Sequence, residues 1–297
     1  MFKTGFITII GKANVGKSTL TNKIVGEKVS IVTFRPQTTR DRILGICTEK
    51  DYQLIIVDTP GIHNPKNKLS EYMMKSVTSA VEGVDGIVYM ISCDKKLNDE
   101  EIESISKYAK AGTPLVIAIN KCDEAKQEDI LSRIDMLKDI KNVKAIIPIS
   151  ARTGKNVDEL KNELVKLLPE GEMRFVDDEM TDKSTSFIVS EYIREKALKL
   201  LGDEIPYGVG VVVNKFSQRE DGIVDIDADI ICEKQAHKSI IIGKGGSMIK
   251  EISTQSRKDI ENLLQTKVFL TVFVRVKEDW RNRPELLNSL GYKPSEL

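Results

Sequence analysis

The segment Gly11–Ser18, which reads GKANVGKS, constrains the fold of this chain more than any other feature. It matches the pattern G-x-x-x-x-G-K-[ST] and lies between a strand-like run, GFITII, and a helical run, STLTNKIVG. In such a loop, glycines let backbone N–H groups surround phosphate oxygens, and the positive end of the helix attracts them. Lys17 then reaches the β- and γ-phosphates, and the Ser18 hydroxyl ligates Mg²⁺. The segment predicts a nucleoside triphosphate site; the alternative is a glycine-rich turn that matches by coincidence.

Up to about Leu168, short apolar runs alternate with helical patterns. The runs GFITII, DYQLIIVD, GIVYMIS, PLVIAIN and AIIPIS are almost continuously apolar, as are strands of a parallel sheet covered on both faces. Amphipathic segments such as NDEEIESISKYAKAG and NVDELKNELVKLLPEG lie between them. This alternation predicts an α/β domain with a mostly parallel sheet over residues 1–169.

A second motif, Asp58-Thr-Pro-Gly61, follows the apolar run LIIV and so lies at the carboxyl edge of the predicted sheet. There Asp58 can hold Mg²⁺ through a water molecule, and the Gly61 N–H can contact the γ-phosphate. DTPG alone is an ordinary turn, but its place after the phosphate loop favours a switch segment.

The motif Asn120-Lys-Cys-Asp123 closes the strand PLVIAI and indicates which base is bound. The carboxylate of Asp123 can accept hydrogen bonds from N1–H and the 2-amino group of guanine, whereas adenine has neither donor. Lys121 can lie over the base, Asn120 can tie this loop to the phosphate loop, and a backbone N–H at Ser150-Ala151 can reach the guanine O6. GTP is therefore favoured over ATP, which stays a remote alternative. The predicted nucleotide-binding residues are Gly11, Lys12, Ala13, Asn14, Val15, Gly16, Lys17, Ser18, Asp58, Thr59, Pro60, Gly61, Ile62, Asn120, Lys121, Cys122, Asp123, Ser150 and Ala151.

The sequence changes character after Leu168. Residues 170–182 carry six acidic residues against one Arg, and residues 170–185, which lack periodicity, are predicted to form an exposed acidic linker. Residues 186–297 then give a helix, two β-like runs, a glycine turn at Gly243-Lys-Gly-Gly246, a helix through Leu264 and a last strand, VFLTVFVRVK. This order predicts a small α+β domain.

Together the nucleotide motifs resemble the Ras-like P-loop GTPase superfamily, and Gln37-Thr-Thr-Arg-Asp41 narrows the match to its translation-factor-like branch. The GKGG turn, in helix-first order, resembles the G-x-x-G loop of a type II KH domain. A Ras-like domain followed by one such KH domain is similar to the Era family of bacterial ribosome-assembly GTPases. The resemblance covers nearly the whole chain.

The resemblance implies several roles that the residues alone do not. Thr39 is expected to complete the Mg²⁺ shell and contact the γ-phosphate, although the neighbouring Thr38 stays open as the ligand. Lys17, Thr39 and Gly61 are then the catalytic residues. Asn14 matches relatives that hold K⁺ near the β/γ bridge, whereas the default interpretation is an Asn in a turn.

Ile62 departs from the Ras pattern, which has a water-orienting Gln at this position. The side chain of isoleucine neither donates nor accepts a hydrogen bond, so it cannot orient the attacking water. Transfer of the γ-phosphoryl group must therefore depend on Lys17, Mg²⁺ and backbone donors. We therefore expect slow intrinsic hydrolysis and a timed switch.

A KH loop clamps about four nucleotides, because its glycines allow close approach of the sugar–phosphate chain while an apolar groove holds the bases. The segment 237–283 carries ten basic against five acidic residues, although the whole chain has net charge zero. The alternative is a glycine turn beside a solvated charged helix. Family resemblance implies small-subunit (16S) ribosomal RNA near its 3′ end, and the 30S subunit, as partners. The predicted RNA-binding residues are Lys238, Ile242, Gly243, Lys244, Gly245, Gly246, Ile249, Lys250, Arg257 and Lys258.

The cysteines, the lengths of the apolar runs and a few single residues limit the remaining possibilities for cofactors, location and function. The four cysteines are scattered and predict reduced thiols without zinc or disulfides, and no apolar run reaches the roughly 20 residues of a membrane span. We expect no secretory signal, a cytoplasmic protein and no stable oligomer, and the resemblance adds peripheral contact with the inner face of the membrane. His63 and His237 are expected in surface loops, and Trp280 as an anchor rather than a base-stacking residue. The competing function is a GTP-dependent adaptor whose KH-like domain docks on proteins or a membrane surface.

Overall fold

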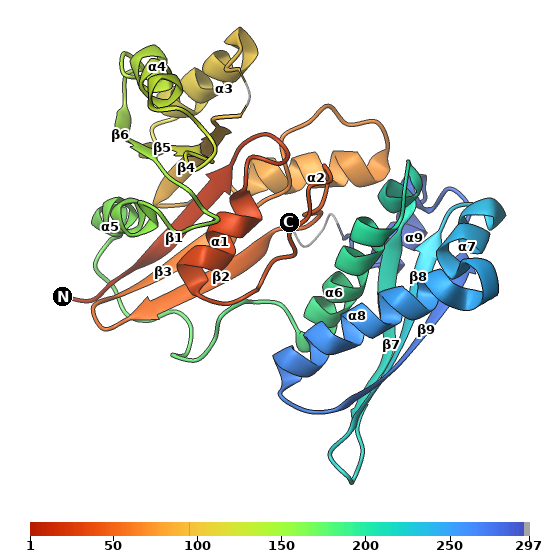
Figure 1. The fold of residues 1–297 in the computed structure, drawn as a ribbon. Helices are drawn as coiled ribbons and strands as arrows, with labels where there is room; N and C mark the ends of the chain where they lie inside the picture. Colours follow the sequence, from red (N-terminus) through yellow and green to blue (C-terminus); the bar gives the residue numbers. More distant parts are fainter. Residues whose placement is uncertain (95, 294–297) are drawn as a thin grey trace.

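The computed structural model describes residues 1–94 and 96–293, which form two α/β units side by side (Figure 1). The first unit contains a six-stranded sheet in the order β2-β3-β1-β4-β5-β6, and only the β2–β3 pair is antiparallel. Its strands are β1 (Lys3–Ile10), β2 (Ile43–Glu49), β3 (Tyr52–Asp58), β4 (Gly86–Ser92), β5 (Leu115–Asn120) and β6 (Val143–Pro148). Its helices are α1 (Lys17–Val25), α2 (Lys68–Ser79), α3 (Asp99–Lys110), α4 (Gln127–Leu137) and α5 (Val157–Leu167).

Helices cover both faces of this sheet, as the apolar strands predict. Leu20 of α1 and Leu164 of α5 pack against one face, and α2, α3 and α4 contribute side chains such as Ile105 to the other. The carboxyl ends of β1, β3 and β5 therefore meet at one edge of the sheet, and each of these strands leads directly into one of the three nucleotide motifs. The expected mostly parallel sheet is confirmed.

The edge strand β2 is the element that the sequence does not reveal. Its sequence, ILGICTE, mixes apolar and small residues and is followed by a tight turn into β3, so it lacks the continuous apolar pattern of the other strands. Gly45 is required here, because a Cβ on it would lie 2.8 Å from side-chain carbons of Thr21 and Val25. The strand thus packs closely under α1.

The second unit contains a three-stranded sheet in the order β7-β8-β9, in which β7 and β8 are antiparallel and β8 and β9 are parallel. Ile193 of α6 and Ile252 and Ile260 of α8 pack against one face of this sheet. The run SIII, expected only to precede the glycine turn, belongs to a separate helix, α7. The elements are α6 (Thr185–Leu200), β7 (Gly210–Gln218), β8 (Val224–Cys232), α7 (Gln235–Ile242), α8 (Ser247–Leu264), β9 (Val268–Val276) and α9 (Pro284–Ser289).

The acidic linker runs along the free edge of β2 (Figure 1). The Ile46 N–H donates to the Met180 carbonyl at 2.9 Å, and the Leu44 N–H donates to the Asp182 carboxylate. Gln53 accepts from the backbone of Arg174 through its Oε1 atom at 2.9 Å. Most linker side chains are exposed as expected, but the backbone covers an edge that would otherwise be open to pairing.

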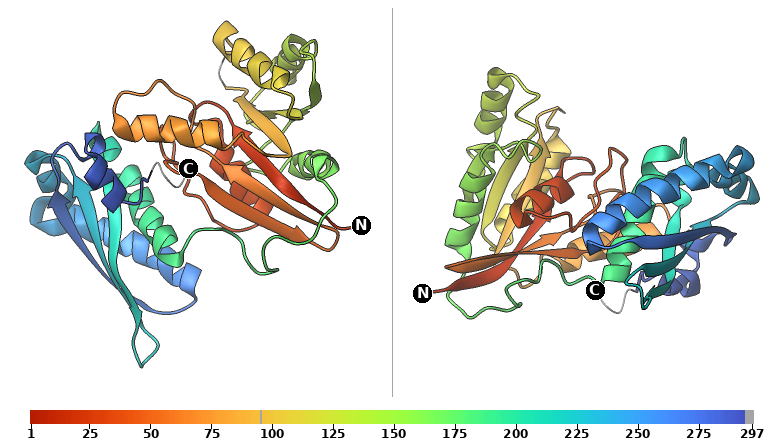
Figure 2. Two further views of the ribbon diagram at one scale, coloured as in Figure 1. Left: turned by 180° about the vertical axis from the view of Figure 1, so that it is seen from behind. Right: turned by 60° about the horizontal axis from the view of Figure 1, so that its bottom comes forward.

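The loop 30–42, called here the switch loop, lies between the two units and is held by α6 (Figure 2). The Arg194 guanidinium donates to the Thr38 carbonyl at 2.6 Å. In the other direction, Arg35 donates through Nε to the Leu198 carbonyl at 2.6 Å, and Arg40 donates to the Val209 carbonyl at 2.6 Å. The loop is therefore part of both units.

Glu195 of α6 is the charged centre of this contact. Its Oε1 accepts from the Val32 N–H at 3.1 Å, and its Oε2 lies 2.8 Å from Lys28 Nζ. Burial alone would raise the pKa of Glu195, but the hydrogen bond and charge of Lys28 and the Val32 N–H lower it to about 2. The carboxylate side chain is only 1% exposed, so solvent screens these contacts weakly.

Glu195→Gln is therefore expected to destabilise the protein in a pH-dependent way. Because the folded-state pKa lies below the ordinary value near 4.5, the charged form stabilises the fold above about pH 4.5, and this is lost as the pH falls toward 2. The shift corresponds to about 3 kcal/mol at neutral pH. Urea unfolding should show the variant less stable at pH 7, with the gap narrowing below pH 4.5. The control is Glu163→Gln, which changes a surface pair with Lys166; a gap that does not change with pH would contradict the assignment.

A second contact joins α2 to the end of the chain. Tyr72 of α2 lies edge-on to Tyr292 at a centroid distance of 5.7 Å, and Tyr292 stacks on Trp280 at 6.2 Å. Trp280 is fully buried and donates from Nε1 to the Gly208 carbonyl at 2.9 Å. The tryptophan is an anchor, as expected, and not a base-stacking residue.

Candidate nucleotide and RNA-binding sites

The phosphate loop connects β1 to α1 and is fixed to the base-reading loop. Gly16 has φ 105°, and a Cβ on it would lie 2.2 Å from Nδ2 of Asn120, so only glycine fits. That Nδ2 atom donates to the Val15 carbonyl at 2.7 Å. The contact predicted between the Asn120 side chain and the phosphate loop is therefore present.

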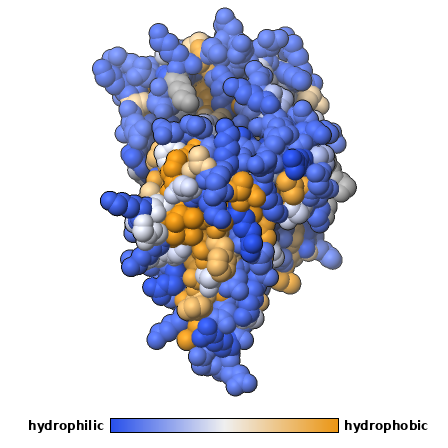
Figure 3. All heavy atoms as spheres, turned by 90° about the vertical axis from the view of Figure 1, so that its right-hand side faces the viewer, coloured by the Kyte–Doolittle hydropathy of each residue, from blue (hydrophilic) through white to orange (hydrophobic). Residues whose placement is uncertain are grey.

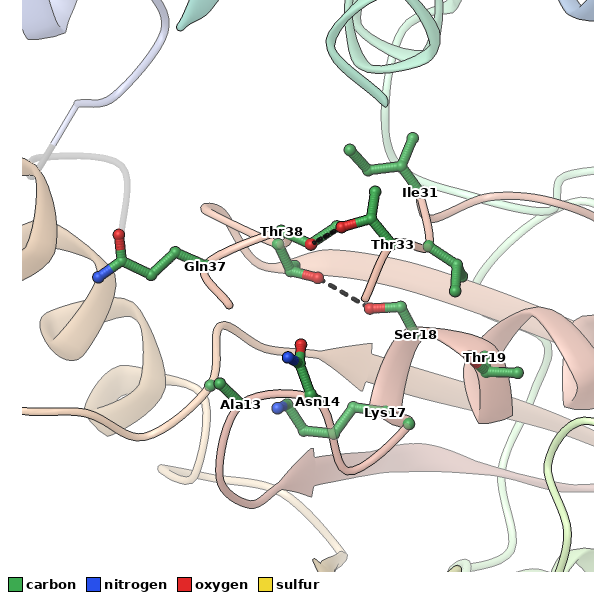
Figure 4. A pocket seen from close by; sticks show the side chains of 13 residues that line it. Ala13, Asn14, Lys17, Ser18, Thr19, Ile31, Thr33, Gln37 and Thr38 are labelled. Atoms are coloured by element: carbon green, nitrogen blue, oxygen red, sulfur yellow. Dashed lines mark hydrogen bonds between the residues drawn. The ribbon is translucent and has the colours of Figure 1, made fainter. Parts of the chain in front are cut away.

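Lys17 lies across the phosphate loop (Figure 4). Its Nζ donates to the carbonyls of Gly11 and Lys12, both at 3.1 Å. Burial lowers the pKa of Lys17 to about 8, against the opposing charge of Asp58. A buried ammonium whose hydrogen bonds go to neutral carbonyls is strongly stabilised by an added anion such as a phosphate chain.

Three oxygen-bearing side chains converge beside Lys17. The hydroxyls of Ser18 and Thr39 are 2.8 Å apart, and Asp58 is fully buried at the end of β3. No group among the described residues lies within hydrogen-bonding geometry of either Asp58 carboxylate oxygen. Burial raises the pKa of this carboxyl group, against the effects of the nearby Ser18 and Ser30 hydroxyls and the charge of Lys17. Two hydroxyls and an unpartnered carboxylate fit Mg²⁺, a hard cation that keeps part of its water shell.

The side chains of the adjacent residues Thr38 and Thr39 make different contacts in the structure. Thr38 Oγ1 is 2.6 Å from Thr33 Oγ1 and donates to the Arg35 carbonyl at 2.7 Å, so it is used within the switch loop (Figure 4). Thr39, in contrast, points at Ser18. The geometry favours Thr39 as the metal ligand.

Gly61 approaches the phosphate loop more closely than a side chain would allow. A Cβ on it would lie 2.7 Å from the Ala13 Cα, and the next residue, Ile62, donates its N–H to the Gly11 carbonyl at 3.0 Å. His63 Nδ1 is 2.6 Å from the Gly61 carbonyl. His63 lies in the loop between β3 and α2, as expected, but is half-buried beside the site, whereas His237, also half-buried, lies on helix α7 and not in a loop.

Several predicted contacts can be made only through the backbone, because the side chains face elsewhere. Lys12 pairs with Glu101 of α3, and the Thr59 hydroxyl donates to the Ile9 carbonyl at 2.7 Å. Cys122 turns inward toward Cys93. The roles predicted for these residues therefore rest on their main-chain atoms.

The base-reading side chains lie around a cavity of about 590 Å³. Asp123 has a lowered pKa: burial opposes the shift, and hydrogen bonds from Ser150 and Arg152 cause it. A backbone N–H at Ser150-Ala151 was expected to reach the guanine O6, but here the Ala151 N–H donates to Asn120 Oδ1 at 2.9 Å and the Ser150 N–H donates to the Lys155 carbonyl at 3.0 Å. The cavity is lined by Asn14, Gly16, Thr19, Val32, Thr33, Phe34, Asp94, Asn120, Lys121, Asp123, Glu124 and Arg152.

Seven of these lining residues were missed by the sequence reasoning: Thr19, Val32, Thr33, Phe34, Asp94, Glu124 and Arg152. Arg152 donates from Nε to Asp123 Oδ2 at 3.1 Å, and its place directly after Ser150-Ala151 was a usable signal. Asp94 holds Lys121 Nζ at 2.6 Å. Phe34 is 73% exposed and enters the cavity only because the switch loop folds back, which local sequence does not indicate.

The GKGG turn joins α7 to α8. Gly243, Gly245 and Gly246 have φ angles of 75°, 60° and 78°, so all three occupy the left-handed region that favours glycine. A Cβ on Gly243 would lie 2.7 Å from the Met248 N atom, whereas Gly245 and Gly246 face open space. The turn thus exposes backbone that a sugar–phosphate chain can approach.

An apolar groove of about 640 Å³ begins next to this turn. Apolar atoms gather on this side of the molecule, where α7 and β9 lie (Figure 3). Ile242 and Ile249, the candidate groove walls, line one side of it, together with Lys238, which was expected only to add to the basic field. The opposite wall, missed from the sequence, is β9, which supplies Val272, Phe273, Val274, Arg275 and Val276.

Two predicted RNA-binding residues lie away from this groove. Arg257 is eleven residues beyond Gly246 along α8, a distance of about 16 Å at 1.5 Å per residue. It pairs with Glu261 at 3.0 Å, and neither it nor Lys258 lines the groove. Lys250 lies one residue beyond Ile249 and is exposed. Among the described residues no three or more His, Cys, Asp or Glu side chains form a group that could hold a metal ion, and no helix is long and apolar enough to span a membrane.

Both halves of the chain are similar to known protein families. Residues 6–121 match the family model of a 50S ribosome-binding GTPase, and residues 204–281 match that of a KH domain. The chain is 47% identical over 293 residues to GTPase Era of Clostridium botulinum strain Langeland, covering 99% of each chain. It is 49% identical over the same length to GTPase Era of Clostridium kluyveri, covering 99% of this chain and 100% of that protein.

Solved structures of similar proteins match along the full length. The crystal structure of Era in complex with MgGDPNP and nucleotides 1506–1542 of 16S ribosomal RNA superposes with a TM-score of 0.94 at 36% identity. It covers 98% of this chain and 99% of that one. A single-residue variant of Aquifex aeolicus Era bound to GDP and AlF4⁻ matches with the same TM-score, identity and coverage.

Proposed function

The chain belongs to the Era family of GTPases, and from this premise we propose a GTP-hydrolysing switch that binds small-subunit (16S) ribosomal RNA near its 3′ end and assists 30S assembly. The observation that carries the proposal is the pairing of two sites in one molecule. Oxygen ligands and Lys17 converge at the phosphate loop, and a groove beside the GKGG turn lies in the other unit.

In the nucleotide site, we assign the triphosphate to the loop Gly11–Ser18, with Lys17 on the β- and γ-phosphates and the Gly61 N–H on the γ-phosphate. Ser18 and Thr39 would hold Mg²⁺ directly, and Asp58 would hold it through water. Bound Mg²⁺ neutralises charge that develops on the phosphate oxygens. Asp123 would read the guanine edge. A K⁺ ion at Asn14 stays a prediction; the Asn14 amide NH₂ donates to the Phe34 carbonyl at 2.7 Å, which leaves its oxygen for a cation.

In the RNA site, the GKGG backbone would hold phosphates while bases enter the groove between α7 and β9. We place the unit boundaries at residues 169/170 and 185/186, on either side of the linker. We place the protein in the cytoplasm, where ribosomal subunits are assembled. Contact with the inner face of the membrane and the absence of a stable oligomer stay predictions.

The two sites are connected by the switch loop, which supports coupling between nucleotide state and RNA binding. The loop carries Thr39 at one end and is held by α6 through the backbone of Thr38 and the side chain of Arg35. A γ-phosphate that orders Thr39 would therefore change how α6 is held, and with it the presentation of the KH domain. Allosteric couplings of this kind are usually about 5- to 150-fold.

Arg35→Ala is expected to reduce this coupling, because it removes two hydrogen bonds from the switch loop to the end of α6. The measurement is the affinity for a 16S 3′-end RNA at fixed salt, with a GTP analogue and with GDP. In the unaltered protein the two affinities should differ by at least about fivefold, and in the variant the ratio should move toward one. Lys138→Ala, at a surface pair on the far side of the first unit, is the control. Equal affinities in the unaltered protein would refute direct coupling.

The RNA site itself is tested by reversing one charge. Lys244→Asp is expected to weaken RNA binding by roughly 10- to 100-fold, because it replaces a phosphate partner by a repelling carboxylate at the closest approach. Arg257→Asp makes the same change in net charge about 16 Å away along α8, and it should weaken RNA binding much less. Equal losses would indicate a diffuse basic field, and unchanged binding with lost 30S function would favour the adaptor alternative.

A further inference from the structure

Two thiols meet beneath the base-reading loop. Cys93 follows the last residue of β4, and Cys122 lies two residues after the end of the parallel neighbour β5. Their sulfur atoms are 3.7 Å apart, and both side chains are buried. The Cys93 N–H also donates to the Asn120 carbonyl at 2.9 Å, so the backbones of the two segments are held together.

This contact lies directly under residues that line the base cavity. Each cysteine is followed by a lining residue, Asp94 after Cys93 and Asp123 after Cys122. Lys121, which precedes Cys122, pairs with Asp94 at 2.6 Å. A change in the separation of the two sulfur atoms must therefore be transmitted to Asp123.

We propose that Cys93 and Cys122 are a redox modification site, in which a peroxide-class oxidant forms a disulfide that displaces Asp123 and weakens guanine-nucleotide binding. The effect on binding rests on the proposed function of Asp123, whereas formation of the disulfide does not. A disulfide has an S–S length of about 2.05 Å, so the two sulfurs must approach by ~1.7 Å. A displacement of about 1 Å at a positioned group can reduce its function about 100-fold.

The two thiols have different roles in the reaction. The hydrogen bond with Cys122 lowers the pKa of Cys93, against the effect of burial, and the charge of Arg133 adds to the shift. The same hydrogen bond raises the pKa of Cys122. The Cys122 thiol also donates to the Ile119 carbonyl at 3.1 Å, a contact that requires its proton. Because the thiolate is the reactive form, Cys93 is the attacking sulfur and Cys122 the resolving one.

The chemistry is balanced with hydrogen peroxide as the oxidant. The Cys93 thiolate attacks one peroxide oxygen, the S–O bond forms, the O–O bond breaks, and hydroxide leaves to take up a proton as water. Cys122 then attacks the Cys93 sulfenic acid: the S–S bond forms, the S–O bond breaks, and a second water leaves with the Cys122 proton. Two thiols lose two electrons, which reduce the peroxide, and a dithiol reverses the change.

The other two cysteines provide a comparison within the same chain. Burial raises the pKa of both Cys47 and Cys232. Cys47 lies on β2 and Cys232 at the end of β8, in different units, so they cannot join each other. A selective oxidation should therefore spare them.

The test uses the full-length protein treated with hydrogen peroxide and digested without reduction for peptide mass spectrometry. We expect a Cys93–Cys122 linked peptide that is two mass units lighter than the two thiol peptides, and dissociation of a fluorescent GDP at least about tenfold faster. Dithiothreitol should restore the slow rate. Cys93→Ser should bind GDP normally and resist the oxidant, with Cys93→Ala as a second variant and Cys47→Ser as the control.

Three results would overturn the proposal: no link between the two cysteines, a link that leaves GDP dissociation unchanged, or equal oxidant sensitivity in the Cys93 variants. Failure of the reduced protein to bind GDP would refute the proposed function instead. The linked peptide would still report on the thiol pair in that case.

Discussion

Asp123→Asn is expected to reduce the affinity for GDP and GTP by roughly 10²- to 10⁴-fold. The variant loses two hydrogen bonds to a charged acceptor, each contributing about 1.5–3 kcal/mol, and it offers its own NH₂ group to the donors of guanine. Xanthine has a carbonyl in place of the 2-amino group, so xanthosine nucleotides should gain affinity in the variant. Base preference, rather than overall binding, is therefore the decisive quantity.

The measurement is a titration of the variant and the unaltered protein with fluorescent guanosine, xanthosine and adenosine diphosphates. Asp135→Asn is the matched control, because Asp135 is an exposed carboxylate on α4 paired with Lys138. It should leave all three affinities unchanged. If the unaltered protein held adenosine nucleotides as tightly as guanosine nucleotides, Asp123 would not be the base-reading group.

Gly61→Ala should slow GTP hydrolysis by about 10²- to 10³-fold while leaving the affinity for GDP nearly unchanged. A Cβ would lie 2.7 Å from the Ala13 Cα, so the DTPG segment must move away from the phosphate loop and take the Gly61 N–H with it. Loss of one preorganised donor to a developing charge usually reduces a rate by about 10²- to 10³-fold. GDP, which lacks the γ-phosphate, should bind with an affinity within a few-fold of that of the unaltered protein.

Single-turnover hydrolysis of GTP measures this effect, and Gly202→Ala is the control. A Cβ on Gly202 meets no atom within 4 Å, and its φ is ordinary, so this variant should behave as the unaltered protein. The rate of GTP hydrolysis by the unaltered protein is expected to be low, because the Ile62 side chain has no group that can orient water. A rate near the usual enzymatic value of ~10 s⁻¹ would contradict that expectation, and an unchanged rate in Gly61→Ala would remove Gly61 from the mechanism.

The meeting of the three nucleotide motifs at one edge of the sheet could be predicted because it depends on local sequence. Each motif follows a strand that is apolar throughout, and parallel strands bring their carboxyl ends to one edge. The link from Asn120 to the phosphate loop was predicted for this reason and is present. The alternative of Thr38 or Thr39 could not be decided, since adjacent residues differ only in which way the folded loop turns them.

Features that depend on distant partners could not be predicted. The strand β2 is identified by its pairing with β3, and the groove wall at Val272–Val276 depends on how β9 lies against α7. Arg257 and Lys258 of α8 were predicted among the RNA-binding residues, but the helix carries both of them away from the groove. The contacts of the switch loop with α6 join residues more than 150 positions apart, for which no local pattern exists.

The position of Trp280 gives the protein an intrinsic optical probe. It is the only tryptophan in the sequence, and the Arg40 guanidinium of the switch loop lies 5.8 Å from its ring. Indole emission responds to nearby charge and to polarity, so any sliding of one half of the molecule against the other should alter its intensity or wavelength. Stopped-flow fluorescence could then follow the switching cycle in real time, without attaching a dye.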